Sequence, residues 1–333
     1  MKKKGFISIM KMKSMFLILI FSLLLNEKVF SLSWGHLYGI DRSTSIGSFV
    51  EIENNLKNYN RLINLGRMSI SGGATASKSI DNQNYIVTYY ISDSFGVPHY
   101  FLLIIDVNNN TSKIKSNITL NGQGIGSFWQ IDDNEKEIIG IRESFHSGAS
   151  LELASINSTN GFIQTIGLYP YGSYSLVMTF ARERRIYYNL IDSYLFCGIN
   201  VDNGNLDVKL NLPNGYSIYA IVYDSIKDQL LSIVYSSVIE ENGWFIAKII
   251  LENNSTQMKF ERIGKSVIPM KGRYFWSTTY TLALKQRQWI TLWDDSNHPN
   301  NNVIFTFDID NGNIIHNQTI NNSKDLKNLV YFD

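Results

Sequence analysis

A hairpin that recurs along the chain constrains the fold more than any other feature. Its clearest copy is Phe305–Ile320, in which an apolar-alternating strand runs into Asp310, Asn311 and Gly312 before a second strand begins. Asp or Asn followed by Gly favours a tight turn, because these residues tolerate positive φ. The same pattern of strand and turn residues occurs at six places: Leu37–Gly47, Leu102–Thr111, Leu151–Gly161, Leu195–Gly204, Phe245–Ser255 and Val303–Gly312.

Successive copies lie 45 to 65 residues apart, a spacing typical of four-stranded propeller blades with variable loops. No window keeps the 3.6-residue apolar period of a helix over three turns. Other segments rich in β-branched and aromatic residues precede the hairpins and predict further strands: Asn84–Ile91, Glu137–Ile141, Arg185–Leu190, Gln229–Tyr235 and Gln288–Trp293. The sequence therefore predicts an all-β chain, a single β-propeller of six or seven four-stranded blades.

The C-terminal run Leu329–Phe332 reads as a strand with no partner beside it in the sequence. In a closed propeller, a terminal strand can complete the sheet that the other end of the chain begins, which removes exposed edges. We expect this run to pair in the blade that contains Leu37–Asp41, so that N- and C-terminal strands close the ring. The alternative is an untethered tail.

The pattern of an apolar strand, a turn with Asp or Asn and Gly, and a second strand is seen best in Ile199–Leu206 and Phe307–Ile314. It resembles the repeats of quinoprotein-like, YVTN and WD40-type propellers. The resemblance covers most of the chain and implies the propeller fold. It does not extend to the signatures of one family, because Trp293-Asp294 is a single instance and Gly-His pairs do not recur. The tryptophan docking motif of quinoprotein dehydrogenases is absent as well, so we expect no cofactor.

The N-terminus has the pattern of a secretory signal peptide. Five lysines, the last of them Lys13, precede the apolar run Met15–Leu25, which is short for a membrane span and suits a signal core. Val29 and Ser31 predict cleavage near residue 31, leaving a propeller domain over residues 32–333. We expect a secreted protein, or one in the secretory lumen, without a stable membrane span. The alternatives are an uncleaved anchor and an intracellular scaffold.

Eight Asn-x-Ser/Thr sequons agree with secretion, and several of them fall in predicted turns. We predict glycosylation at these positions: Asn109, Asn110, Asn117, Asn157, Asn253, Asn254, Asn317 and Asn321. Cys197 is the single cysteine, so the chain has no internal disulfide. Its strand-like surroundings predict a buried, unreactive thiol.

The composition allows a large core and limits the partners. Hydrophobic residues make up 44% of the chain, and the formal net charge is +1. Nothing in that charge favours a nucleic acid. We expect a monomer.

Several motifs suggest chemistry and do not meet its requirements. Asp308-x-Asp310-x-Gly312 resembles the start of a calcium loop, but no later Glu supplies the remaining ligands, which favours a hairpin turn. Gly122–Gly126 resembles a phosphate loop, but strand-like residues follow it instead of a helix. Ser71 and Ser147 are not in a nucleophile elbow, and the turn Arg182–Arg185 reads as a solvated charged loop.

A glycosidase would need two facing carboxylates, and the sequence selects no pair among Asp132, Asp133, Glu152, Asp192, Asp224, Asp294 and Asp295. The histidines have no metal-ligand spacing, so we expect no metal site: His36, His99, His146, His298 and His316.

Loops on one rim of a propeller commonly carry its binding residues. We therefore place the candidate ligand-binding residues in Ser92–His99, Glu143–Ser150 and Asp294–Asn300, namely His99, His146, Asp294, Asp295 and His298. The expected function is a non-enzymatic binding module for a protein or a carbohydrate. The alternative is a secreted propeller enzyme (a glycosidase, lyase or hydrolase) with acidic residues at the central channel.

Overall fold

The computed structural model confirms the propeller, and it has six blades. It describes residues 35–42, 46–53, 55–67, 76–79, 83–107, 112–120, 125–130, 137–143, 151–168, 177–238, 243–252, 255–264, 280–295 and 298–332, with side chains omitted at 77, 125–130 and 143. The predicted signal peptide lies outside these residues. In the part of the chain that is described, no helix is long and apolar enough to cross a membrane.

Each blade is a four-stranded sheet, and in blades 2 to 6 neighbouring strands follow one another in the chain. Blade 1 combines the C-terminal strand with β1–β3, and blades 2 to 6 are β4–β7, β8–β11, β12–β15, β16–β19 and β20–β23. The strands are β1 His36–Asp41, β2 Gly47–Ile52, β3 Tyr59–Gly66, β4 Ser77–Lys78, β5 Asn84–Ser92, β6 Pro98–Asp106, β7 Lys113–Thr119, β8 Ile125–Gln130, β9 Glu137–Glu143, β10 Leu151–Asn157, β11 Ile163–Leu168, β12 Met178–Ala181, β13 Ile186–Ile191, β14 Leu195–Asn200, β15 Leu206–Asn211, β16 Tyr216–Asp224, β17 Gln229–Ser236, β18 Gly243–Ile250, β19 Lys259–Arg262, β20 Tyr280–Ala283, β21 Gln288–Asp294, β22 Asn302–Asp308, β23 Ile314–Ile320 and β24 Leu326–Phe332.

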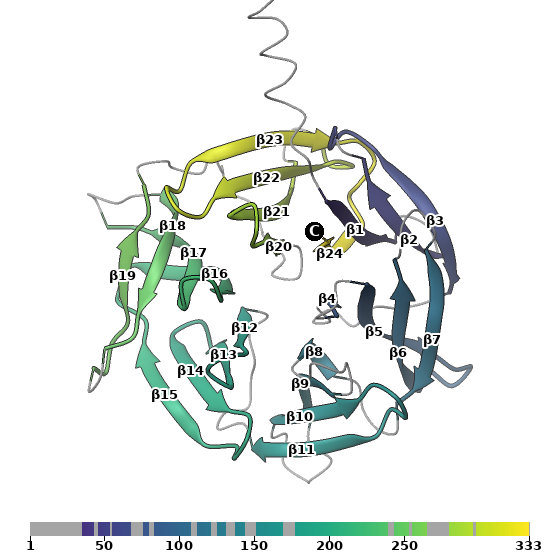
Figure 1. The fold of residues 1–333 in the computed structure, drawn as a ribbon, viewed down its shortest axis with the longest axis horizontal. Helices are drawn as coiled ribbons and strands as arrows, with labels where there is room; N and C mark the ends of the chain where they lie inside the picture. The colour runs from purple at the N-terminus through teal and green to yellow at the C-terminus, as the bar shows by residue number, and fades with distance from the viewer. Residues whose placement is uncertain are drawn as a thin grey trace, which may run out of the picture. The chain divides into compact units, whose positions relative to one another are not determined.

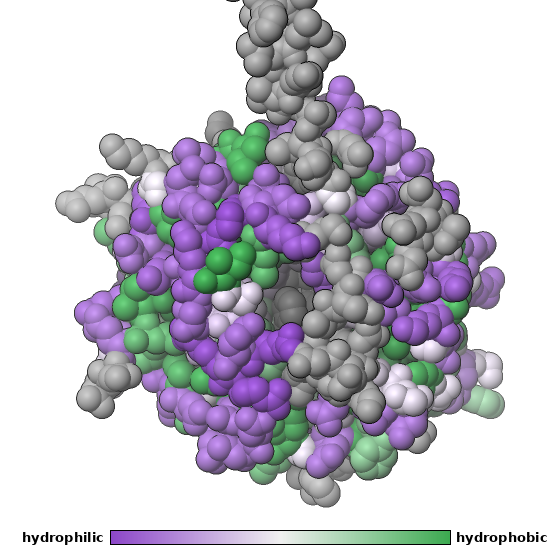
Figure 2. Space-filling model, viewed as in Figure 1, coloured by the Kyte–Doolittle hydropathy of each residue, from purple (hydrophilic) through white to green (hydrophobic). Residues whose placement is uncertain are grey.

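The first strand of each blade lies nearest the centre of the ring and the fourth runs along its perimeter (Figure 1). The face drawn in Figure 2 is hollowed near its centre. The Tyr280 hydroxyl donates to the carbonyls of Met178 and Ile221 and so joins β12, β16 and β20, the inner strands of the three consecutive blades 4 to 6.

The core lies between neighbouring blades rather than inside one sheet. Blades 5 and 6, for example, share a cluster that includes Leu231, Trp244, Trp289, Trp293 and Phe307. Both faces of each middle strand are therefore buried, which explains why the second and third strands are so rich in apolar residues. Cys197 is fully buried in the cluster between blades 3 and 4, as predicted, and its burial raises the pKa of the thiol to about 11.

The ring closes as the sequence predicts. Strand β24 pairs antiparallel with β1, so that Val330 lies opposite Tyr38 and Phe332 opposite His36. The C-terminal strand is thus the innermost strand of blade 1, which leaves β1 with partners on both edges (Figure 1).

The recurring turn joins the third and fourth strands in blades 2 to 6. In blade 6, the Asp308 Oδ1 accepts from the amides of Asp310 and Asn311, and Gly312 has a φ of +70°. A Cβ on Gly312 would overlap the Ile263 carbonyl of blade 5, so the glycine is required by the neighbouring blade as well as by the turn. The calcium-like motif is therefore a hairpin, as predicted.

One member of the predicted repeat is not equivalent to the others. The hairpin at Leu37–Gly47 joins β1 to β2, the second and third strands of blade 1. The equivalent third-to-fourth turn of that blade follows Ile52 instead. The long first spacing in the sequence arises because the ring closes inside blade 1, so β1 is already a second strand.

Candidate binding face

The two ends of the propeller carry different loops. Neighbouring strands in a blade are antiparallel, so turns from the first to the second strand lie at one end, and loops from the second to the third lie at the other. We call these the 1–2 turns and the 2–3 loops. The described parts of the predicted binding segments at residues 92–99 and 294–300 belong to 2–3 loops and therefore share one end, while residues 144–150 lie outside the described part.

The 2–3 loops carry exposed apolar side chains in four of the six blades. These are Ile46 in blade 1, Phe95 and Val97 in blade 2, Tyr194 in blade 4 and Val238 in blade 5, with exposed fractions of 39, 90, 52, 56 and 39%. Isolated exposed apolar residues are ordinary, and Ile226 and Phe162 are exposed in turns at the opposite end. The 2–3 loops are a candidate contact surface because four of them each carry such a residue in their described part. The sequence analysis missed these residues, although an aromatic residue inside the turn sequence Asp-Ser-Phe-Gly was a visible signal.

The loop between β5 and β6 is held by hydrogen bonds around Asp93. The Asp93 carboxylate accepts from the amides of Phe95 and Val97 at 2.8 and 2.9 Å. The backbone adds bonds from the Asp93 amide to the Val97 carbonyl and from the Gly96 amide to the Asp93 carbonyl. Gly96 has a φ of +80°, which glycine adopts without strain. The turn therefore holds the Phe95 ring out into solvent.

His99, a predicted binding residue, supports this loop from β6. Its Nε2 lies 3.2 Å from the second oxygen of Asp93. The pKa of the Asp93 carboxyl is lowered mainly by the hydrogen bond from the Val97 amide. The acid is thus ionised at neutral pH, and it organises the turn as well as contributing charge.

The third predicted segment, Asp294–Asn300 in blade 6, contains another histidine–carboxylate contact. His298 Nδ1 lies 3.0 Å from the Asp295 carboxylate, and the Asp295 amide donates to the Asn301 carbonyl. Asp295 is buried while His298 is exposed. Asp294, at the end of β21, raises the pKa of Lys327 on β24, although burial of that lysine outweighs it.

The structure brings together only part of the predicted set. Asp295 contacts His298, while His99 belongs to a different blade and contacts Asp93. His146 lies outside the described residues, so its predicted role stays a prediction.

At the opposite end, the 1–2 turns of three blades are rich in charged residues. In blades 4, 5 and 6, eight of the twelve residues in the 1–2 turns (residues 182–185, 225–228 and 284–287) carry a charge. Arg184 donates to Asp228 of the next blade at 2.7 Å, and Arg185 contacts Asp202 of its own blade. The Arg182–Arg185 turn, expected to be solvated, therefore contributes to contacts within and between blades.

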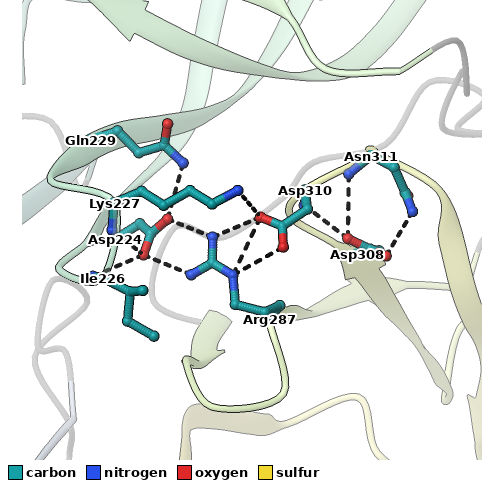
Figure 3. Close-up of polar contacts among 8 residues, drawn as sticks. All are labelled: Asp224, Ile226, Lys227, Gln229, Arg287, Asp308, Asp310 and Asn311. Atoms are coloured by element: carbon teal, nitrogen blue, oxygen red, sulfur yellow. Dashed lines mark hydrogen bonds and ion pairs between the residues drawn. The ribbon is translucent and has the colours of Figure 1, made fainter.

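Arg287 lies between two aspartates in a polar cluster of blades 5 and 6 at this end (Figure 3). Its Nη1 and Nη2 donate to the two oxygens of Asp224 at 2.8 and 2.7 Å, a bidentate pair. Its Nη2 also lies 2.7 Å from Asp310, which accepts from Lys227 as well. Three hairpins of blades 5 and 6 thus meet on one guanidinium.

The two carboxylates that accept from Arg287, those of Asp224 and Asp310, are ionised at neutral pH. Burial alone would raise the pKa of Asp224, but hydrogen bonds from Arg287 and Gln229 outweigh it and leave the pKa below its ordinary value. Hydrogen bonds from Arg287 and Lys227 lower the pKa of Asp310 to about 2. A pair held this way cannot supply a proton near neutral pH, so it does not match the general acid of a glycosidase.

The other acidic candidates lie in different surroundings. Glu152 is buried and accepts from Arg142 and Thr165. Asp192 occupies a tight turn in the left-handed region. Asp132 and Asp133 lie outside the described residues. In the described part, no group of three or more His, Cys, Asp or Glu side chains is placed to hold a metal ion.

The predicted glycosylation sites differ in their surroundings. Asn317 and Asn321 are exposed, and the Asn157 Oδ1 accepts from Thr159 in a turn. Both amide atoms of Asn117, in contrast, contact the Tyr89 hydroxyl, at 2.7 and 3.0 Å. Four sequons, at Asn109, Asn110, Asn253 and Asn254, lie outside the described residues.

Comparisons with known proteins agree with the fold. No protein-family model matches the chain, and no curated protein matches its sequence. Among solved structures, a protein of unknown function from Bacteroides caccae is similar with a TM-score of 0.56 at 9% identity. The periplasmic gluconolactonase of Pseudomonas aeruginosa is similar with a TM-score of 0.53 at 11% identity. Each alignment covers 90% of this chain and 99% of the other, and at these identities the likeness shows the fold alone.

Proposed function

We propose that this chain is a secreted, N-glycosylated β-propeller that binds another protein through its 2–3 loops and catalyses no reaction. One observation carries the proposal: among the described residues, the 2–3 loops of four blades each carry an exposed apolar side chain, and Phe95, the most exposed of them, is 90% exposed. Protein interfaces are enriched in aromatic residues that contribute most of the binding energy, and loops on a rigid scaffold can present them at low entropic cost.

The state of the acidic residues supports binding over hydrolysis. Glu152 and Asp224, two of the candidates for a catalytic pair, are buried and paired with arginines. A retaining or inverting glycosidase needs one carboxyl that is protonated at its working pH. Apolar loop tips also fit a protein better than a carbohydrate, which needs many polar contacts.

The proposal is tested by adding charge to each end in turn. The variant Tyr194→Asp/Val238→Asp alters the 2–3 loops, while Ile226→Asp alters an exposed apolar residue in a 1–2 turn. Proteins that copurify with the secreted chain are quantified by mass spectrometry. We expect a partner whose recovery falls at least tenfold with the loop variant and is unchanged with Ile226→Asp. Equal recovery with both variants would refute the proposal.

A further inference from the structure

We infer that the β5–β6 hairpin is the anchor of this interface, and that Phe95 enters an apolar pocket of a partner protein that has a basic residue beside it. The inference rests on the proposed function and names the contact and the chemistry of the partner.

Phe95 stands out among the exposed apolar residues of the chain. Its exposed fraction of 90% is the largest in the set, and Val97 and Ile91 of the same hairpin are exposed beside it. A single aromatic side chain inserted in a pocket is the usual form of a binding hot spot. Tyr90 and Tyr100 face each other across the two strands below the tip, with ring centroids 5.7 Å apart, and Tyr100 packs against the core between blades 2 and 3, so the base of the hairpin is held by the core.

The hairpin is organised before it binds. The two Asp93 side-chain bonds and the two backbone bonds across the turn fix the residues on either side of Phe95. Strands β5 and β6 continue in register from Ser92 and Pro98 down to Asn84 and Asp106, deep in the blade. Ordering a loop on binding costs free energy, and a preformed loop avoids most of that cost.

Charge selects the class of partner. From Asn84 to Val107 the chain has no lysine or arginine, and the charged groups of the hairpin are Asp93 and Asp106. A loop that inserts in an anionic membrane usually combines apolar residues with cations, which this hairpin does not have. The ionised Asp93, beside the base of Phe95, instead complements a lysine or arginine at the rim of a protein pocket.

The test uses the full-length chain with a photoreactive benzophenone amino acid at one position at a time. Position 95 tests the anchor, position 194 tests another 2–3 loop, and position 226 tests the opposite end as the control. We expect positions 95 and 194 to crosslink to the same protein and position 226 not to do so. The crosslinked residues of the partner, mapped by mass spectrometry, should surround an apolar pocket with a cation.

Affinity for that purified partner then separates the roles of the residues. Phe95→Ala should weaken binding by about 30-fold or more, as for a hot-spot residue. Asp93→Asn keeps the acceptor that holds the turn and removes the charge, so it should weaken binding mainly at low salt. Asp93→Ala removes both and should weaken binding at any salt concentration, while Ile226→Ala should have no effect.

Other crosslinking and affinity results would refute the inference, and they distinguish a failure of the anchor from a failure of the proposed function. Crosslinking from position 194 without position 95 would leave the proposed function standing and refute the anchor. A lipid adduct at position 95 would replace the protein partner with a membrane. No crosslink from either loop would refute both, and an unchanged affinity of Phe95→Ala would refute the anchor even if a partner is captured.

Discussion

Removing the charge of Arg287 tests whether the cluster in Figure 3 stabilises the propeller. Asp224 is completely buried, and the arginine neutralises it through two hydrogen bonds. Arg287→Met keeps much of the side-chain volume but leaves that carboxylate buried without a countercharge. Breaking a buried pair in this way costs about 3–5 kcal/mol of the free energy of unfolding. In a propeller of this size, the loss corresponds to a fall in melting temperature of roughly 5–15 °C.

Blade 4 supplies a matched control. Arg185 directly precedes β13, as Arg287 directly precedes β21, and both residues have a positive φ. Each also donates to an aspartate that lies two residues before the glycine of a turn, Asp202 for Arg185 and Asp310 for Arg287. The partner of Arg185, however, is Asp202, whose side chain is 55% exposed. An exposed pair contributes about 0–1 kcal/mol, so Arg185→Met should be nearly neutral.

The two variants are compared by guanidinium unfolding, followed by tryptophan fluorescence. The midpoint should fall clearly for Arg287→Met and little for Arg185→Met, with unchanged slopes. In the double variant Asp224→Asn/Arg287→Met the buried charge is gone, so part of the lost stability should return. Equal midpoints for the two single variants would show that burial of Asp224 does not determine the strength of this cluster.

Three further outcomes follow from the same structure. Because the pKa of Asp310 is lowered to about 2, its ion pair stabilises the fold fully above the unfolded carboxyl pKa of about 4; the free energy of unfolding should therefore fall as pH decreases from 4 to 2, and a flat profile in urea unfolding would contradict this. If the chain is exported and N-glycosylated as proposed, Asn157→Gln should remove one glycan and Asn117→Gln none, since the Asn117 amide is bound to Tyr89; glycopeptide mass spectrometry measures this. Deleting Leu326–Phe332 should expose the edge of β1 and cause aggregation, measured by light scattering.

The fold could be predicted because the residues that specify its turns and strands lie within those turns and strands. Each turn is specified by residues within it, as in Asp308 and Gly312, and the strands are rich in residues that favour sheets. The pairing of Leu329–Phe332 with the first blade was also predictable, because an unpartnered terminal strand leaves an edge that a closed ring removes. The number of blades was not fixed by spacing, since the loops between blades vary in length.

The candidate site was less predictable, for physical reasons. Asp224 and Arg287 are 63 positions apart, and only the assembled ring places them in contact. Exposure is likewise a property of the folded chain: a phenylalanine in a turn sequence is apolar wherever it lies, and only the backbone of the β5–β6 loop directs Phe95 outward. The contact between Asp93 and His99 could have been predicted from the sequence, because the two residues lie six positions apart in the same hairpin.

The distribution of charge between the two ends connects stability to binding. Among the described residues, the 1–2 turns of blades 4, 5 and 6 join neighbouring hairpins through arginines and aspartates, and the pairs between blades, Arg184–Asp228 and Arg287–Asp224, resist separation of the blades. In the described 2–3 loops, the contacts Asp93–His99 and Asp295–His298 each lie within one blade. An end that is not required for closure can present apolar residues such as Phe95 and Tyr194 to a partner. We therefore expect substitutions in the 1–2 turns to change stability first and substitutions in the 2–3 loops to change binding first.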